Sequence, residues 1–119
     1  MQDDTNAAHV AADYARMIRE DVQGAMQPDV AAADYVADAL DAEYVVTSRG
    51  DVAGVRLTVA TGGPHVDVHY RVGSDTVTVA AAWWSPVAEH DVHAPALAAE
   101  LDALAEAWQD AYIATGVRR

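Results

Sequence analysis

Residues 55–84 read VRLTVATGGPHVDVHYRVGSDTVTVAAAWW, a stretch that alternates apolar and polar side chains over three segments. Two turn sequences, Thr61-Gly62-Gly63-Pro64 and Gly73-Ser74, separate the segments and are typical of β-hairpin loops. Pairing the segments across these loops sets apolar residues opposite one another in both hairpins. A shift of one residue would turn these side chains to the opposite face, so the agreement between the hairpins favours this register. The predicted pairs are Tyr70–Val77, Val68–Val79, Val66–Ala81, Val59–Val66, Leu57–Val68 and Val55–Tyr70.

A further strand is predicted immediately before this stretch. A turn at Gly50-Asp51 brings another apolar-polar alternation alongside it, again with the apolar residues on one side. The sequence therefore predicts a four-stranded antiparallel meander over residues 44–84. The pairs predicted for this first hairpin are Val46–Val55 and Tyr44–Leu57.

Three segments outside the sheet carry apolar residues at helical spacing. Thr5 is the predicted N-cap of a first helix running to about Met26. Pro28 suits the first turn of a second helix that runs to about Asp41, and a last helix runs from about Pro95 to Ala114. The predicted buried stripes are Val10, Tyr14, Met17, Ile18, Val22 and Met26; Val30, Ala33, Val36, Ala37 and Leu40; and Leu97, Leu101, Leu104, Ala105, Trp108 and Tyr112.

The element order α-α-β-β-β-β-α is typical of a two-layer α+β fold with helices on one face of the sheet. A chain of 119 residues fits one domain of ordinary size. We therefore expect a single α+β domain over residues 1–119. Residues 1–43 would hold the two N-terminal helices, residues 44–84 the antiparallel sheet and residues 94–115 the C-terminal helix.

The composition excludes several classes of site. The chain has no cysteine, so disulfides, thiolate metal sites and thiol nucleophiles are ruled out. The N-terminus lacks the features of a signal peptide, and no apolar run reaches the roughly 18 residues of a membrane span. These features predict a cytoplasmic protein without membrane association.

The charge is strongly negative, with 19 acidic residues against seven arginines and a net charge of −12. Residues 1–47 carry −8 of this total, residues 48–90 carry −1 and residues 91–119 carry −3. Such acidity fits either a salt-adapted or GC-rich organism or a surface that binds a basic partner. Direct binding of nucleic acid is not expected, because the phosphate backbone would repel this surface. Asp34 and Asp38 of the second helix are candidate contacts to a basic partner.

The polar side of the predicted sheet is a second candidate surface, which we call the open face. Strand alternation places the side chains of residues 65, 67, 69 and 71 on it, and the proposed register sets Arg56 beside His69. It is either a solvated surface with pairs of Arg56 and Arg71 to Asp67, or a protein-binding surface anchored by Trp84. The candidate partner-binding residues here are Arg56, His65, Asp67, His69, Arg71 and Trp84.

A metal site is a further alternative. Side chains two apart on a strand are separated by about 6.6 Å and those four apart by about 13 Å, which is too far for one ion. Additional ligands would have to come from the segment after the sheet, although that segment also reads as the approach to the last helix. The candidate ligands are His65, Asp67, His69, His90 and His93.

Catalytic motifs are not recognisable. Ser48, Ser74 and Ser85 are all predicted in turns, without the context of a nucleophile elbow. The glycine-rich loop at residues 61–64 links two strands, whereas a phosphate-binding loop leads into a helix. We therefore expect a protein that is not an enzyme and uses no cofactor.

Two segments carry a resemblance to a known group of proteins. The loop Thr61-Gly62-Gly63-Pro64 with Val66 and Val68 after it, and the strand exit Trp83-Trp84-Ser85-Pro86, resemble short acidic proteins of phages and plasmids with a strand-TGGP-strand core. The likeness covers residues 53–110 and supplies no catalytic residues. It implies an accessory protein of a mobile element, a context in which small acidic proteins block host defence, including CRISPR complexes, in some cases by imitating DNA. The arginines and histidines of the sheet depart from the simplest DNA mimic.

The sequence thus predicts a non-enzymatic acidic interaction module that binds a basic, nucleic-acid-handling protein, with inhibition or anti-defence (anti-CRISPR) as the role the resemblance implies. Two alternatives remain open. One is an acidic domain of a halophilic or GC-rich organism that forms a homodimer through the open face. The other is a histidine-rich protein that binds a metal or small ligand.

Overall fold

The central hairpins form as predicted in the computed structural model, which describes residues 7–82 and 87–114. Strands β2 (Val52–Ala60), β3 (His65–Arg71) and β4 (Thr76–Ala82) are antiparallel neighbours. One predicted pair is wrong, because an irregularity between Thr58 and Ala60 sets Ala60, and not Val59, opposite Val66. The confirmed pairs are Val55–Tyr70, Leu57–Val68, Tyr70–Val77, Val68–Val79 and Val66–Ala81.

Strand β1 (Asp41–Val46) begins three residues earlier than predicted and pairs in a different register. Tyr44 lies opposite Val55, and Ala42 lies opposite Leu57. The predicted register is therefore wrong by two residues. A shift of two keeps every side chain on its predicted face, which is why the alternating pattern could not detect it.

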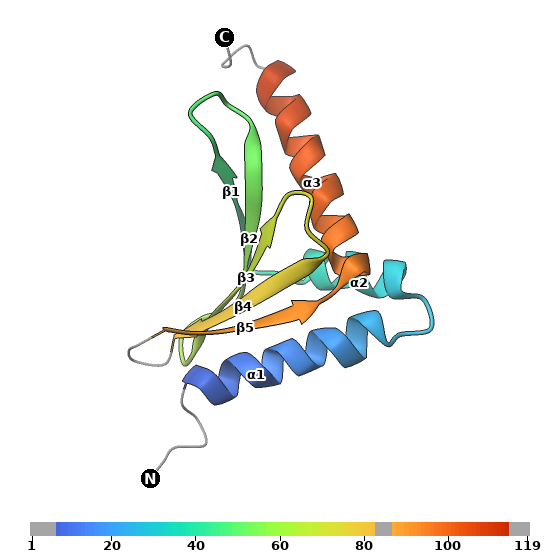
Figure 1. Ribbon diagram of the computed structural model, residues 1–119, viewed down its shortest axis with the longest axis vertical. Helices are drawn as coiled ribbons and strands as arrows, with labels where there is room; N and C mark the ends of the chain where they lie inside the picture. The colour runs from blue at the N-terminus through green and yellow to red at the C-terminus, as the bar shows by residue number, and fades with distance from the viewer. Residues whose placement is uncertain (1–6, 83–86, 115–119) are drawn as a thin grey trace.

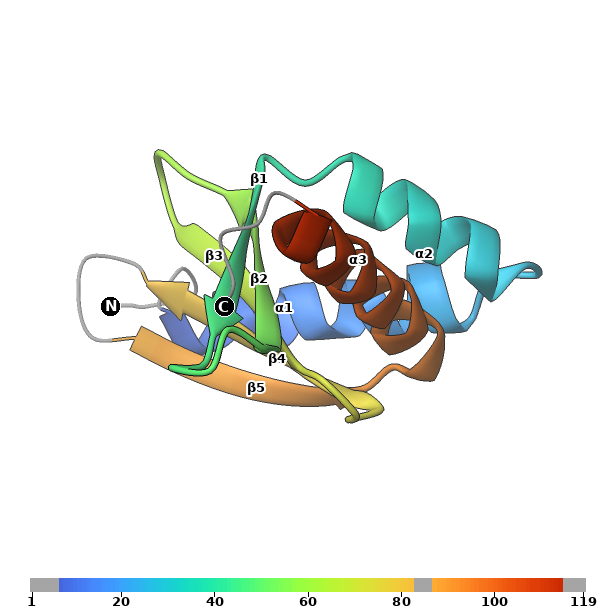
Figure 2. The same cartoon turned by 90° about the horizontal axis from the view of Figure 1, so that it is seen from above.

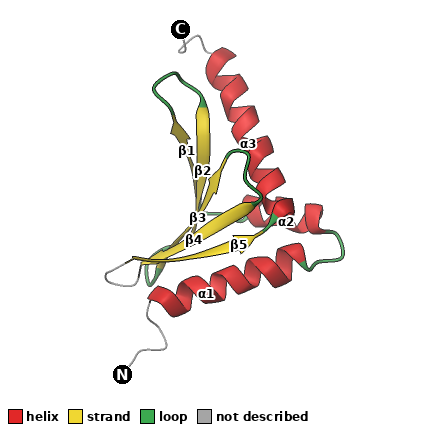
Figure 3. Ribbon diagram, in the orientation of Figure 1, coloured by secondary structure: helices red, strands yellow, loops and turns green. Residues whose placement is uncertain are grey.

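A fifth strand, β5 (Val87–His93), completes an antiparallel sheet with the order β1-β2-β3-β4-β5 (Figure 3). The prediction of four strands, with this segment approaching the last helix, is wrong. Val92 is buried opposite Val77, whereas Glu89, His90 and Asp91 are exposed. Because β5 is an edge strand with polar side chains on both faces, its sequence lacks the apolar alternation of the central strands.

The first helix is shorter than predicted. An α-helix, α1 (Ala7–Met17), continues directly into a π-helical segment, η1 (Ile18–Gln23), which ends at Gly24. Met26 lies beyond the helix and is fully exposed, so its predicted place in the buried stripe is wrong. The predicted cap Thr5 lies outside the described residues. The side chains that are buried are Ala7, Ala11, Ala15, Ile18 and Val22.

Helix α2 (Pro28–Ala37) starts at the predicted proline but buries a different face. It packs against α3 and η1 rather than against the sheet, and Ala32 is its only fully buried residue. Val30 and Leu40 are 53% and 62% exposed, so the predicted stripe through them is wrong. Apolar residues occur on several sides of this alanine-rich helix, so their spacing did not identify the side that packs.

Helix α3 (Pro95–Ala114) has the predicted bounds, and Leu97, Leu101 and Ala105 of its predicted stripe are buried. Two glutamines connect it to distant parts of the chain. The Leu97 backbone N–H at its start donates to Gln23 Oε1 over 3.1 Å. Near its end, Gln109 accepts from the Val52 N–H at 2.6 Å and donates to the Gly50 carbonyl at 3.0 Å.

The helices cover one face of the sheet and leave the open face bare (Figures 1 and 2). Helix α1 packs under β4 and β5, while α3 runs along β2. The core between the layers is aliphatic, with Leu57, Val68, Val79 and Leu101 fully buried. No helix in the described ranges is both long enough and apolar enough to cross a membrane.

Candidate functional site

The open face presents a row of polar side chains across all five strands. Arg56 and His69 lie side by side on β2 and β3, as the sequence predicted, and Thr78 on β4 lies beside His69. Glu43 on β1 and Asp91 on β5 extend the row to both edges of the sheet. The hairpin register therefore brings together residues that are 48 positions apart in the sequence.

Cross-strand contacts hold most of these side chains in place. Asp67 Oδ1 accepts a hydrogen bond from Thr58 Oγ1 at 3.0 Å and lies 3.1 Å from His65 Nε2. Arg56 forms an ion pair with Glu43 of the neighbouring strand. The predicted pairing of Arg56 with Asp67 is therefore wrong, because β1 supplies a closer carboxylate.

The second edge of the row is also paired. Thr78 Oγ1 donates to Asp91 Oδ1 over 2.6 Å, and His93 Nδ1 lies 3.7 Å from Asp75 Oδ1. Arg71 is exposed and, within the described residues, pairs with no carboxylate, so its predicted pair with Asp67 is also wrong. Among the described residues, Arg71 is thus an unpaired cation on the open face.

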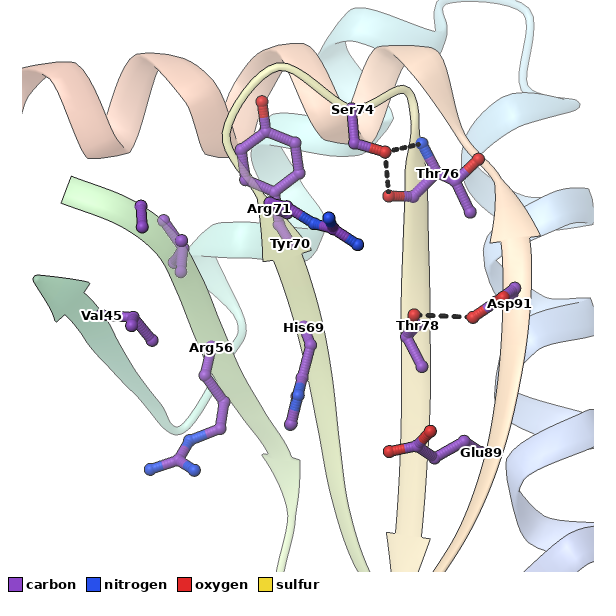
Figure 4. A pocket seen from close by; sticks show the side chains of 13 residues that line it. Val45, Arg56, His69, Tyr70, Arg71, Ser74, Thr76, Thr78, Glu89 and Asp91 are labelled. Atoms are coloured by element: carbon purple, nitrogen blue, oxygen red, sulfur yellow. Dashed lines mark hydrogen bonds between the residues drawn. The ribbon is translucent and has the colours of Figure 1, made fainter. Parts of the chain in front are cut away.

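A hollow of about 500 Å³ lies on the open face over β2, β3 and β4 (Figure 4). The His69 imidazole belongs to its lining, and its Nε2 atom is buried without a hydrogen-bond partner among the described residues. A buried polar atom without a partner costs about 1–3 kcal/mol. The other polar side chains of the lining are Arg56, Arg71, Ser74, Thr76, Thr78, Glu89 and Asp91.

A second hollow of about 430 Å³ adjoins the first, and Arg56 lines both. Its polar lining includes His65 and Asp67, together with Glu43 and Asp41 from the edge strand. The ion pair of Arg56 with Glu43 thus lies where the two hollows meet. Both hollows have charged and apolar residues in their lining.

The proposed metal ligands are separated by the sheet. His65, Asp67 and His69 project from the open face, whereas His90 lies opposite Val79 and therefore belongs to the helix-covered side. His93 sits at the far edge beside Asp75. Among the described residues, no group of three or more histidine, aspartate or glutamate side chains is arranged to hold an ion. The five-residue metal site is thus not assembled.

Asp34 lies on α2 and Asp38 is the C-cap directly after it, in the helical layer on the other side of the sheet from Arg56 and His69. Both are exposed, and neither forms an ion pair with a described residue. The candidate partner-binding residues therefore divide between two surfaces. Trp84, the predicted aromatic anchor, and Trp83 lie outside the described residues.

Four acidic residues of the open face were not among the predicted site residues. Asp41 and Glu43 precede the predicted sheet but belong to β1, and Glu89 and Asp91 belong to the unpredicted strand β5. The signal that could have identified the last two is their spacing of two within the segment from Val87 to His93. Two strands at the edges thus add the acids that balance the central arginine and histidines.

Tyr70 borders the hollow, but its side chain lies on the helix-covered side of the sheet. Tyr70 OH donates to Asp102 Oδ1 of α3 over 2.8 Å and accepts from the Gly73 N–H at 3.1 Å. Burial raises the pKa of Tyr70 above its ordinary value. This side chain therefore ties the floor of the open face to α3.

Comparison with family models, with curated proteins and with solved structures gave no match to this chain.

Proposed function

We propose that this protein is a non-enzymatic interaction module whose acidic helical layer binds a basic, nucleic-acid-handling protein. The observation that carries the proposal is a pair of exposed carboxylates, Asp34 on α2 and Asp38 at its C-cap, which lack basic partners among the described residues. The segment from Ile18 to Asp38 holds five carboxylates against one arginine. A basic surface is the chemical complement of this segment.

The position of these two carboxylates supports a role other than folding. Asp34 and Asp38 are four residues apart, and like charges at this spacing destabilise a helix by about 0.2–0.5 kcal/mol. Asp38 also caps the C-terminal end of α2, where the helix dipole disfavours negative charge. Since neither carboxylate stabilises α2, binding of a cationic partner would account for their presence.

In the mobile-element context that the resemblance implies, the bound protein would be a component of host defence or DNA processing, and binding would inhibit it. The TGGP loop connects the paired strands β2 and β3, which is the arrangement on which that resemblance rests. The open face would then provide a second contact region, through Arg71 and the hollow beside it.

The test uses the neutral double variant Asp34→Asn/Asp38→Asn. Relief of repulsion should leave its melting temperature equal to that of the wild type or slightly higher, so lost binding would not reflect unfolding. The wild-type protein and the double variant each serve as bait, and the proteins that they capture from the native host are identified by mass spectrometry. The partner is then purified, and its affinity is measured at about 0.1 M and 1 M salt, where the Debye length is about 10 Å and 3 Å.

A matched control is Glu106→Gln/Asp110→Asn on α3, which removes two exposed carboxylates at the same spacing. We expect the α2 variant to bind the partner about tenfold more weakly and the α3 control to bind it nearly as well as the wild type. Equal loss in both variants, or affinity independent of salt, would contradict the proposal. Unfolding of the wild type at low salt would instead favour salt adaptation as the reason for its acidity.

A further inference from the structure

Strand β1 is an edge strand whose second half is unprotected. Val45 and Val46 are 58% and 36% exposed, and the run from Tyr44 to Val46 contains no charge or proline. Natural proteins usually block such edges with charged residues, because the free N–H and C=O groups invite another strand. The opposite edge follows this rule, since the middle of β5 is Glu89-His90-Asp91, all exposed.

The outer edge of β1 is regular. The irregularity in its pairing with β2 falls where Val45 faces Gly54 and Val46 faces Val52, so the extra residue, Ala53, belongs to β2. A bulge in β1 itself would bend the strand and discourage pairing. Because β1 itself has no bulge, its outer N–H and C=O groups form an uninterrupted row to which another strand can pair.

An apolar strip on α3 adjoins this edge. The rings of Tyr44 and Trp108 stack at a centroid distance of 5.1 Å, and those of Trp108 and Tyr112 at 4.8 Å. Ala107 and Ala111 follow at helical spacing and are exposed. Val45 lies on the open face of the same edge, with Gly54 opposite it. We call these residues on the two sides of the edge the β1 edge surface, which has no charged member in a chain of net charge −12: Tyr44, Val45, Val46, Trp108, Ala111 and Tyr112.

We propose that a second copy of this chain binds the β1 edge surface by antiparallel pairing of β1 with β1, about a two-fold axis perpendicular to the sheet. An isologous contact of this kind uses one patch on both subunits. The axis keeps the helical layers of the two copies on the same side. Two five-stranded sheets would become one continuous sheet.

The sequence of β1 selects the register. In an antiparallel pair, residues directly opposite each other have their side chains on the same face of the sheet. The two-fold axis must therefore lie where one residue of β1 is opposite the same residue of the second copy. An axis at Glu43 sets two carboxylates against each other, and an axis at Val45 pairs only three residues of the strand. An axis at Tyr44 pairs five residues without opposing like charges, and it sets Val45 opposite Glu43 of the second copy.

This register makes a charge-specific prediction. Val45→Lys places a cation opposite Glu43 of the second copy at both symmetry-related positions, whereas Val45→Glu places an anion there. Cross-strand charge pairs contribute roughly 0.2–1 kcal/mol each. We therefore expect the lysine variant to dimerise at least as tightly as the wild type and the glutamate variant about tenfold more weakly, as measured by sedimentation equilibrium.

Salt separates this inference from the proposed function, on which it does not depend. Two copies of charge −12 repel each other at long range, and salt screens that repulsion. Dimerisation should therefore strengthen as salt is added, whereas binding to a basic partner should weaken. A wild-type protein that stays monomeric across this salt range would overturn the inference, and so would equal dimerisation of the two Val45 variants.

Cysteine cross-linking tests the register directly, because the chain has no native cysteine. In Glu43→Cys/Val45→Cys, each introduced thiol faces one of the second copy at directly paired positions. The matched control is Glu89→Cys/Asp91→Cys, which has the same spacing on the open face of the other edge strand. We expect a disulfide-linked dimer from the β1 variant and background cross-linking from the β5 variant. Equal cross-linking of both would refute pairing through β1.

Discussion

The contact of Gln109 with the β1–β2 hairpin should contribute measurably to stability. Its side-chain oxygen accepts from the Val52 N–H at 2.6 Å, and its side-chain nitrogen donates to the Gly50 carbonyl at 3.0 Å. These two bonds join the tip of a hairpin to a helix 57 or more residues later in the sequence. Gln109→Ala removes both and leaves a partly buried backbone donor without its partner.

The expected magnitude follows from those contacts. Each hydrogen bond contributes about 0.5–1.5 kcal/mol net, and a donor left unsatisfied adds to the loss. The higher helix propensity of alanine returns a few tenths of a kcal/mol. We therefore expect Gln109→Ala to reduce the free energy of unfolding by about 2 kcal/mol, which corresponds to a fall in melting temperature of roughly 8 °C for a domain of this size.

Urea denaturation followed by circular dichroism measures this difference. The control is Asp110→Ala, which makes the same truncation on the next, exposed residue of α3 and should change stability by less than about 0.5 kcal/mol. Hydrogen exchange adds a local readout, because the Val52 amide should lose protection in Gln109→Ala. If both variants were equally stable and the amide stayed protected, the stabilising role assigned to Gln109 would be wrong.

Three further predictions concern the core and the sheet. Burial raises the pKa of Tyr35 from 10.0 to about 12, with a smaller contribution from Tyr14. The native state therefore holds this proton more tightly than the unfolded state, so stability should fall between pH 10 and 12 by roughly 2 kcal/mol. Its hydroxyl is buried without a hydrogen-bond partner among the described residues, so Tyr35→Phe should be neutral or stabilising near pH 7 and should reduce the alkaline loss in a pH series of urea titrations. Gly54→Ala should cost about 1–3 kcal/mol, because a Cβ there would lie 2.6 Å from the Tyr70 carbonyl oxygen; an unchanged melting temperature would contradict this. Leu101→Ala should cost about 2–5 kcal/mol, whereas Leu40→Ala, at a residue 62% exposed, should cost far less, and similar losses in thermal melts would show that the assigned core is wrong.

The candidate site was predicted in its centre and missed at its margins. Arg56, His65, Asp67, His69 and Arg71 occupy the open face because alternation on two paired strands leaves no other side for them. Their actual partners could not be predicted. Glu43 and Asp91 belong to the edge strands β1 and β5. The register of β1 and the formation of β5 depend on contacts that the local sequence pattern does not show.

Separation of the metal candidates has the same origin. His90 and His93 are three residues apart, and on a helix approach they could have faced the same side. On a strand, three residues apart means opposite faces. Because this segment forms strand β5, His90 lies on the helix-covered side of the sheet, away from His65 and His69.

Local sequence determined the elements whose signal is strong within a few residues. The loops at Gly62 and Gly73, both with positive φ, and the apolar alternation between them determined the register of β2, β3 and β4. The spacing of Leu97, Leu101 and Ala105 likewise determined the buried side of α3. In each case an incorrect choice would expose a whole apolar face to water.

Tertiary structure alone decided the features for which local alternatives are nearly equal in energy. A shift of β1 by two residues keeps its faces unchanged, so the register of Tyr44 depends on its stack with Trp108. Helix α2 is apolar on several sides, and the position of α3 selects which side is buried. The segment after residue 86 forms a strand that pairs with the edge of β4, and its Val92 is buried in the layer where α1 packs against β5. These choices depend on contacts between residues distant in the sequence, which no local pattern records.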